Sequence, residues 1–221
     1  MNLHLQPSVL NNVSEIAVTG SKSETNRLLL LQALYKNITL ENVSKSDDSE
    51  VMTKALDLNS QLPTSNSQLV DIHHAGTAMR FLTAYFSVQE NREVVLTGSP
   101  RMKERPIKIL VDALRQLGAT IEYVENDGFP PIKISGKKLL NNKVSLSANV
   151  SSQYISALLL IAPKLENGLE LTLEGEITSI PYIKMTLALL NEIGVVTSFE
   201  KNVIKVNNLQ TITSKLITVE S

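Results

Sequence analysis

Residues 76–136 read "GTAMRFLTAYFSV…VVLTGSPRMKERPIKILVDALRQLGATIEY…PPIKISG", and residues 151–208 read "SSQYISALLLIAP…LELTLEGEITSIPYIKMTLALLNEIGVVTSF…VIKVNN". Each stretch predicts an apolar helix, a strand ending in glycine, a turn with proline, a second helix closed by glycine, and two short strands. The interval from Ile107 to Gly118 equals that from Ile183 to Gly194. We therefore interpret the two stretches as copies of one folding unit.

A third and more degenerate copy begins at residues 20–34, "GSKSETNRLLLLQAL". The helix predicted after Ser21 leads to the strand "NITLENV" and then to an acidic helix start at Asp47 and Asp48. Since every copy mixes helices with short strands, the sequence predicts an α/β fold with several small sheets rather than one long parallel sheet.

The composition limits what the protein can be. The 221 residues are 43% hydrophobic, which is enough for a sizeable core. A formal net charge of -1 gives no electrostatic footprint for nucleic acid or an anionic membrane. The sequence has no cysteine, no secretory leader and no long apolar run. These features predict a cytoplasmic protein that is neither secreted nor membrane-spanning.

Chemically active side chains gather at the predicted helix starts. Anions bind at such positions because the first turn has unpaired N–H groups and the positive end of the helix dipole. If the copies surround a pseudo-threefold axis, the starts converge and form an anion pocket in a neutral protein. The residues concerned are Lys22, Ser23 and Arg27; Gly76, Thr77 and Arg80; and Ser151, Ser152 and Gln153.

The first start has two interpretations. Ser21 and Glu24 match a capping box, which places Lys22 at the first helical position. Ser23 and Arg27 then lie on one face, where a hydroxyl and a guanidinium can hold the same phosphate. The alternative is an ordinary capped helix with a solvated arginine, and the other starts have equivalent capping explanations.

Other polar residues also allow two interpretations. The segment "SPRMKERP" places Arg101, Lys103 and Arg105 between a strand and a helix, either as a solvated loop or as a lid over an acidic substrate. The pair His73 and His74 does not predict a metal site, because adjacent side chains diverge and no third ligand is evident. Tyr154 and Tyr182 are core residues or contribute a phenol to the pocket.

Five motifs follow one another along the chain: "GSKSETNR", "HAGTAMRFL", "LTGSPRMKERPI", "VSSQYISALLLIAP" and "SIPYIKMTLALL". In these motifs the sequence resembles the 5-enolpyruvylshikimate-3-phosphate synthase family. The resemblance implies an inside-out α/β barrel domain made of three βαβαββ repeats with pseudo-threefold symmetry. It also implies helix N-termini directed toward a cleft between two domains.

The implied activity is transfer of the carboxyvinyl group of phosphoenolpyruvate to the 5-hydroxyl of shikimate 3-phosphate, with release of phosphate, in the shikimate pathway to chorismate and the aromatic amino acids. The resemblance implies no metal or organic cofactor. It assigns shikimate 3-phosphate contacts to Lys22, Ser23, Arg27, Ser151, Ser152, Gln153, Ser179 and Tyr182. It assigns phosphoenolpyruvate contacts to Lys22, Gly76, Arg101 and Gln153, with Lys22 as the catalytic residue.

The sequence departs from the family pattern in three ways. His74 stands where the family usually has Asn, and Phe81 stands where many members have Pro, both beside the phosphoenolpyruvate pocket and therefore relevant to the inhibitor glyphosate. Family members are also about twice this long. The resemblance assigns residues 1–13 to the other domain and residues 14–221 to the N-terminal domain, with the C-terminal domain absent.

The sequence thus predicts a monomeric, substrate-binding half of an enzyme that has no useful turnover alone and whose natural partner is the missing domain. Two alternatives remain open at this point: a non-catalytic binding or scaffold module of the same fold, and an enolpyruvyl transferase acting on UDP-N-acetylglucosamine. The motif "SKSETNR" and the absence of cysteine count against the second alternative.

Overall fold

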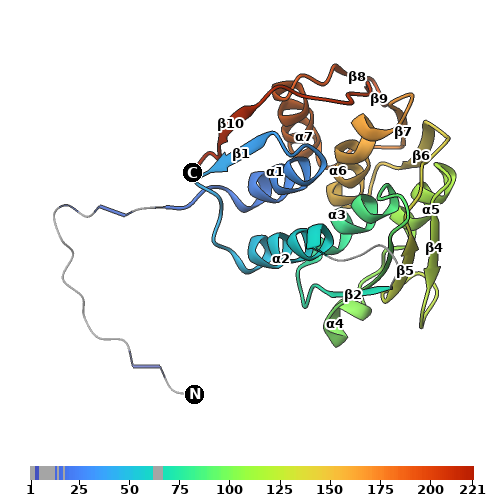
Figure 1. Ribbon diagram of the computed structural model, residues 1–221, viewed down its shortest axis with the longest axis horizontal. Helices are drawn as coiled ribbons and strands as arrows, with labels where there is room; N and C mark the ends of the chain where they lie inside the picture. Colours follow the sequence, from blue (N-terminus) through green and yellow to red (C-terminus); the bar gives the residue numbers. More distant parts are fainter. Residues whose placement is uncertain (1–2, 5–12, 14, 17, 62–66) are drawn as a thin grey trace.

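The computed structural model describes residues 3–4, 13, 15–16, 18–61 and 67–221, with the side chains of 58–61 excepted. The predicted segment 1–13 lies almost entirely outside these residues. The described chain folds into helices surrounded by small sheets (Figure 1).

The first complete repeat forms a four-stranded sheet with two long helices. It consists of β2 (Gln68–Asp71), α3 (Gly76–Ser87), β3 (Glu93–Thr97), α4 (Pro100–Lys103), α5 (Lys108–Gln116), β4 (Thr120–Tyr123) and β5 (Ile132–Ser135). The strand order is β2-β3-β5-β4, with β2 parallel to β3 and the remaining pairs antiparallel. Apart from the short α4, this is the βαβαββ order.

The second complete repeat reproduces the first in order and pairing. It consists of β6 (Lys143–Ser147), α6 (Ser152–Ile161), a 3-10 turn η1 (Ala162–Lys164), β7 (Leu169–Glu174), α7 (Ile180–Glu192), β8 (Thr197–Glu200) and β9 (Val203–Val206). Its strand order is β6-β7-β9-β8, again with one parallel and two antiparallel pairs. The repeat inferred from the sequence is therefore present in the structure.

The third repeat is assembled from both ends of the chain. It consists of α1 (Lys22–Leu34), β1 (Ile38–Glu41), α2 (Asp47–Gln61) and β10 (Lys215–Thr218). β10 pairs parallel with β1, just as β2 pairs with β3 and β6 with β7. Within the described residues this sheet has two strands, so the third repeat lacks the antiparallel pair.

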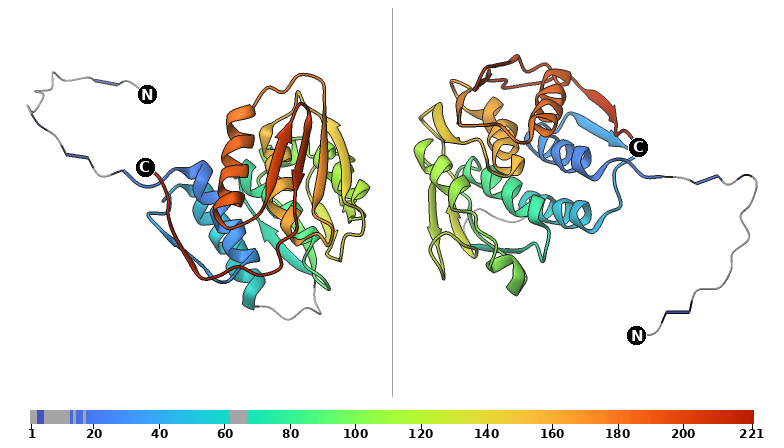
Figure 2. Two further views of the ribbon diagram at one scale, coloured as in Figure 1. Left: turned by 90° about the horizontal axis from the view of Figure 1, so that it is seen from above. Right: turned by 180° about the vertical axis from the view of Figure 1, so that it is seen from behind.

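The helices form the inside of the domain and the sheets its outside. α1 contacts α2, α2 contacts α3, α3 contacts α6, α6 contacts α7, and α7 contacts α1, which closes a ring of helices (Figures 1 and 2). α3 and α6 are buried almost all round, because each packs against several other helices and α3 also packs against β3 and β5. This explains their continuous apolar sequences and confirms the predicted inside-out arrangement.

Several local predictions can be checked against the backbone. Gly118 and Gly194 follow the ends of α5 and α7 with φ of 103° and 96°, the left-handed conformation expected of a glycine stop. α2 begins at Asp47 as predicted. The segment 99–106 was predicted as a turn or loop, but its first half forms α4, because Ser99 caps it and Pro100 fits its first turn.

The two ends of the described domain lie together. The Ser21 N–H donates to the Glu220 carbonyl at 2.7 Å, and the Gly20 N–H donates to the Asn42 carbonyl at 3.1 Å. A Cβ on Gly20 would lie 2.7 Å from Cγ1 of Val219, so only glycine fits between these strands. The chain thus enters and leaves the domain at one place, which all three views show (Figures 1 and 2). Among the described residues no helix is long and apolar enough to cross a membrane.

Candidate active site

The N-terminal halves of α1, α3 and α6 meet, as the repeat predicted. Gln153 in the first turn of α6 donates from Nε2 to Oγ1 of Thr77 in the first turn of α3, at 3.0 Å. Arg27 of α1 donates from Nη2 to Oγ of Ser156 in α6, at 2.9 Å. Side chains of all three helix starts, drawn from three repeats, are thereby connected.

Arg27, one of the predicted site residues, is buried, with 3% of its surface exposed. Its Nε donates to Oγ1 of Thr186 at 2.8 Å, and its Nη1 donates to the Ser23 carbonyl at 2.7 Å. Its Cζ lies 5.5 Å from the ring centre of Phe81 and 5.9 Å from that of Tyr182. The guanidinium is therefore held by dipoles and aromatic faces from α1, α3, α6 and α7.

The hydroxyl groups around Arg27 have a defined direction. Thr186 donates its proton to the Tyr182 carbonyl at 2.9 Å. A threonine hydroxyl has one proton, so the 3.0 Å contact between Ser156 and Thr186 must run from Ser156 to Thr186. Both hydroxyl oxygens are then free to accept from the guanidinium.

No carboxylate forms an ion pair with Arg27 in the described part of the chain. Burial lowers the pKa of Arg27 to about 10, and the nearby Tyr182 opposes this only in part. A buried charge satisfied only by neutral dipoles retains most of its desolvation cost. An anion placed beside it would relieve that cost, so the arrangement is suited to bind one.

Lys22 and Ser23 begin α1, with Lys22 at the first helical position as predicted. The Lys22 Nζ lies 3.1 Å from Oδ2 of Asp48, at the start of α2, and half of the lysine side chain is exposed. The predicted capping box is wrong, since Ser21 makes no side-chain cap bond. The Glu24 side chain instead lies beside the backbone of Glu220, because the chain after β10 runs against this helix start, where the Ser21 N–H donates to the Glu220 carbonyl.

The remaining predicted shikimate 3-phosphate contacts lie at the starts of α6 and α7. Ser151 caps α6 by accepting from the Gln153 N–H at 3.3 Å, and Ser152 and Gln153 are partly exposed beside it. Ser179 precedes α7 without a side-chain cap bond, and Tyr182 follows it with 47% of its surface exposed. The Tyr182 ring contacts Arg27, which joins the start of α7 to the buried arginine.

Arg80 anchors the segment 99–106 to α3. Its Nη1 donates to the Gly76 carbonyl and its Nη2 to the Pro106 carbonyl, each at 3.1 Å. The Tyr154 hydroxyl donates to the same Pro106 carbonyl at 2.7 Å, and the Tyr154 ring lies 5.8 Å from Cζ of Arg80. Two donors on one carbonyl fix where α4 and its cations stand.

The other singled-out residues lie around this region. His73 and His74 are exposed, and no group of three or more metal-binding side chains occurs among the described residues. Phe81 is fully buried beneath Arg27. Arg101 is exposed at the start of α4. Its role in binding stays a prediction, as do those of Lys22, Gly76 and Gln153.

The structure adds two site residues that sequence reasoning missed, Ser156 and Thr186. Both are fully buried in mostly apolar helices, and both accept from Arg27. A hydroxyl inside an apolar helix often bonds only to its own backbone. The sequence alone therefore indicates a site role for these two hydroxyls only weakly, and their contact with Arg27 in the folded chain identifies it.

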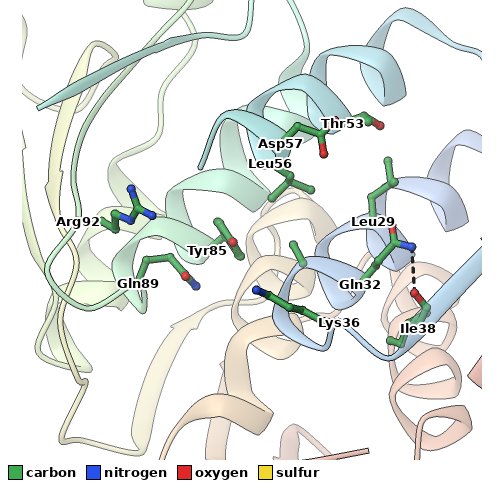
Figure 3. A pocket seen from close by; sticks show the side chains of 11 residues that line it. Leu29, Gln32, Lys36, Ile38, Thr53, Leu56, Asp57, Tyr85, Gln89 and Arg92 are labelled. Carbon is green, nitrogen blue, oxygen red and sulfur yellow. Dashed lines mark hydrogen bonds between the residues drawn. The ribbon is translucent and has the colours of Figure 1, made fainter. Parts of the chain in front are cut away.

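A separate hollow of about 460 Å³ opens at the other end of the helix ring (Figure 3). None of the predicted site residues lines it. Its wall comes from α1, α2 and α3, from Ile38 of β1 and from residues that follow α1 and α3, and Gln32 donates within this wall to the Ile38 carbonyl at 3.0 Å. The helix starts do not line this hollow; at those starts Lys22 and Ser151 are exposed, while Arg27 and Arg80 are buried.

Comparisons with known proteins agree with the fold and the motifs. The family model described as EPSP synthase (3-phosphoshikimate 1-carboxyvinyltransferase) matches residues 10–221. A 3-phosphoshikimate 1-carboxyvinyltransferase of Bacteroides fragilis (strain YCH46) is 51% identical over 185 residues, which is 83% of this chain and 43% of that protein. The protein of the same name from Actinobacillus pleuropneumoniae serotype 5b (strain L20) is 44% identical, over 82% of this chain and 47% of that protein.

A solved EPSP synthase structure from Acinetobacter baumannii shares the fold, with a TM-score of 0.76 at 21% identity, over 92% of this chain and 49% of that one. The chain thus spans about half the length of the curated relatives it matches. The family match over nearly the whole chain and the close relatives lead to one conclusion: the chain belongs to the EPSP synthase (3-phosphoshikimate 1-carboxyvinyltransferase) family.

Proposed function

We propose that this chain is the shikimate 3-phosphate-binding half of an enzyme that transfers the carboxyvinyl group of phosphoenolpyruvate to the 5-hydroxyl of shikimate 3-phosphate and releases phosphate. The observation that carries the proposal is Arg27, a buried cation without a carboxylate partner in the described chain, at the meeting point of three helix starts. The family's relatives bear the name of this activity.

The chemistry needs such a surface. Two phosphorylated substrates repel each other, and cations together with fixed dipoles hold them in contact while charge redistributes. In the proposal, Lys22, Ser23 and Arg27 contact shikimate 3-phosphate from α1. Ser151, Ser152, Gln153, Ser179 and Tyr182 contact it from α6 and α7, and Lys22, Gly76, Arg101 and Gln153 contact phosphoenolpyruvate.

The proposal extends to a second domain. Because the chain enters at Gly20 and leaves at Glu220 side by side, both connections can run to one neighbouring body. This supports assigning residues 1–13 to that body, residues 14–221 to the domain described above, and the remaining catalytic groups to the second domain. We expect no steady-state phosphate release by this chain alone, and measurable turnover in a coupled phosphate assay would contradict this.

Titration calorimetry with shikimate 3-phosphate tests the binding function, with shikimate as the ligand that lacks the phosphate. We expect saturable binding that requires the phosphate and is lost in Arg27→Ala. The Arg115→Ala variant is a suitable control, because Arg115 lies in α5 and donates to the Ile121 carbonyl within the same repeat. It should bind like the unaltered chain.

Absence of binding at millimolar ligand would contradict the proposal and favour the alternative of a scaffold module with the same fold. Binding of UDP-N-acetylglucosamine in place of shikimate 3-phosphate would favour the other transferase. Two finer predictions accompany the proposal, a cytoplasmic location and a monomeric state. Light scattering should give a mass near the chain mass of 24.3 kDa, and a doubled mass would contradict the monomer.

A further inference from the structure

The three cations of the segment 99–106 face different surroundings. Lys103 pairs with Oε1 of Glu125 at 2.7 Å, and Arg101 is exposed at the start of α4. Arg105 lies directly on Gly76, at the start of α3. A Cβ built on Gly76 would be 2.5 Å from Nη1 and 2.9 Å from Nη2 of Arg105. The guanidinium therefore occupies the space where any other residue at position 76 would place its side chain.

The backbone on both sides of the Arg105 side chain is fixed. The Arg105 N–H donates to the Met102 carbonyl at 3.0 Å. The next carbonyl, that of Pro106, accepts from Arg80 and from Tyr154. The position of Arg105 over Gly76 thus follows from bonds to α3, α4 and α6 rather than from a freely moving loop.

Positive charge is in excess at this point. Burial lowers the pKa of Arg80, and the neighbouring Arg105 lowers it further, while Tyr154 opposes both. Neither arginine forms an ion pair in the described part of the chain. Arg80 is 4% exposed, and its Nε has no hydrogen-bond partner in the described residues. The unpartnered Nε of buried Arg80 and the exposed guanidinium of Arg105 lie beside the first turn of α3, and together they favour an anion there.

We propose that Arg105 is a further substrate contact, holding an anionic group of phosphoenolpyruvate over Gly76. This inference rests on the proposed function, in which Gly76 contacts the same substrate. The proposal also explains why residue 76 is glycine, because any larger residue would place its side chain where the Arg105 guanidinium lies. It also separates Arg105 from Lys103, which pairs with a surface carboxylate instead.

The test is titration of phosphoenolpyruvate into the chain and its variants, with shikimate 3-phosphate titrated separately into the same samples. Arg105→Ala should weaken phosphoenolpyruvate binding about tenfold or more, because it removes a charge-assisted contact. Arg105→Lys keeps the charge but not the planar fork and should weaken it less. Lys103→Ala is the matched control from the same segment and should bind normally.

A double-mutant cycle tests the link to Gly76. Gly76→Ala should displace the guanidinium and weaken phosphoenolpyruvate binding, and adding it to Arg105→Ala should cause little further loss. Additive losses would overturn the coupling. Unchanged phosphoenolpyruvate affinity in Arg105→Ala, or no phosphoenolpyruvate binding by the unaltered chain, would overturn the role of Arg105. Shikimate 3-phosphate binding in the same samples reports separately on the proposed function.

Discussion

Arg27 and Arg80 are two buried arginines in equivalent places that are held in different ways. Each lies near the start of a repeat helix and donates Nη1 to the carbonyl four residues earlier, Ser23 or Gly76. They are 3% and 4% exposed, and each has an aromatic ring within 6 Å of its Cζ. The same local arrangement, a buried arginine bonded to the carbonyl four residues earlier, thus occurs in two of the repeats.

The partners beyond the helix distinguish the two. Arg27 reaches the hydroxyls of Ser156 and Thr186, which also bond to each other, whereas Arg80 reaches the backbone carbonyl of Pro106. A hydroxyl can rotate toward another partner, while a backbone carbonyl is fixed by the chain. In the proposed function Arg27 exchanges these hydroxyl partners for a ligand, whereas the bond from Arg80 holds the segment 99–106 against α3.

Arg27→Met should give the largest effect, on binding. Removing a charged donor should lower the affinity for shikimate 3-phosphate about 10- to 100-fold. The free energy of unfolding should change by less than about 1 kcal/mol, because an apolar chain replaces an uncompensated buried charge. Ser156 and Thr186 keep their own bonds in this variant.

Calorimetry and urea unfolding of the same sample measure both quantities. A large loss of stability with unchanged affinity would reverse the comparison, since it would make Arg27 the structural arginine.

Arg80→Met should show the opposite balance. The variant loses the bond to Pro106 and the contact with Sδ of Met102 at 3.8 Å, so the segment 99–106 is tied to α3 less firmly. We expect the free energy of unfolding to fall by about 1–2 kcal/mol, because relief of desolvation offsets part of the lost bonds. Shikimate 3-phosphate affinity should stay within about twofold, and hydrogen exchange should speed up in residues 99–106. Unchanged exchange there would remove Arg80 from its anchoring role.

The contrast between these arginines also shows which features of the fold and the site can be predicted from the sequence. The repeat, the glycine stops at Gly118 and Gly194, and the start of α2 were all predictable, because each depends on local backbone chemistry. The convergence of helix starts followed from the repeat. The buried partners of Arg27 did not, since Ser156 and Thr186 lie 129 and 159 residues away from it along the chain.

Several strands were equally hard to predict. The pattern missed β2 and β6, the leading strands of the complete repeats, because each has only four or five residues with exposed positions among them. It also missed that β10 completes the third repeat, because the two paired strands, β1 and β10, are separated by most of the chain. The predicted capping box is absent, since Ser21 makes no side-chain cap bond and Glu24 lies beside the backbone of Glu220. Contacts between the two ends of the chain thus decided the last two cases, and weak local patterns decided the first.

Tyr154→Phe should have a smaller effect than either arginine variant. It removes one of the two donors to the Pro106 carbonyl and leaves the ring beside Arg80 in place. We expect the free energy of unfolding to fall by about 1 kcal/mol, the usual contribution of one neutral hydrogen bond. In combination with Arg80→Met the loss should exceed the sum of the single losses, because the carbonyl then has no donor. Simple additivity in urea unfolding would show that the two donors act independently.

The smallest expected effect concerns Glu24, whose carboxylate lies beside the C-terminal strand. Burial raises the pKa of Glu24, and the like charges of Glu220 and Glu192 add to this, while the backbone bond from Glu220 opposes it. A carboxyl group whose pKa is higher in the folded state opposes folding when it is ionised. That cost is absent below the pKa of the unfolded chain, about 4.3, and is complete once the pH exceeds the folded-state pKa.

Glu24→Gln should therefore raise the melting temperature at pH 7, and the gain should disappear as the pH falls toward 4. Glutamine still offers an oxygen to the Glu220 backbone, so the bond that joins α1 to the end of the chain is retained. Glu104→Gln, at an exposed position beside α4, serves as the control for removing one negative charge. If the gain of Glu24→Gln were the same at both pH values, or equal to that of the control, the effect would come from net charge rather than from burial.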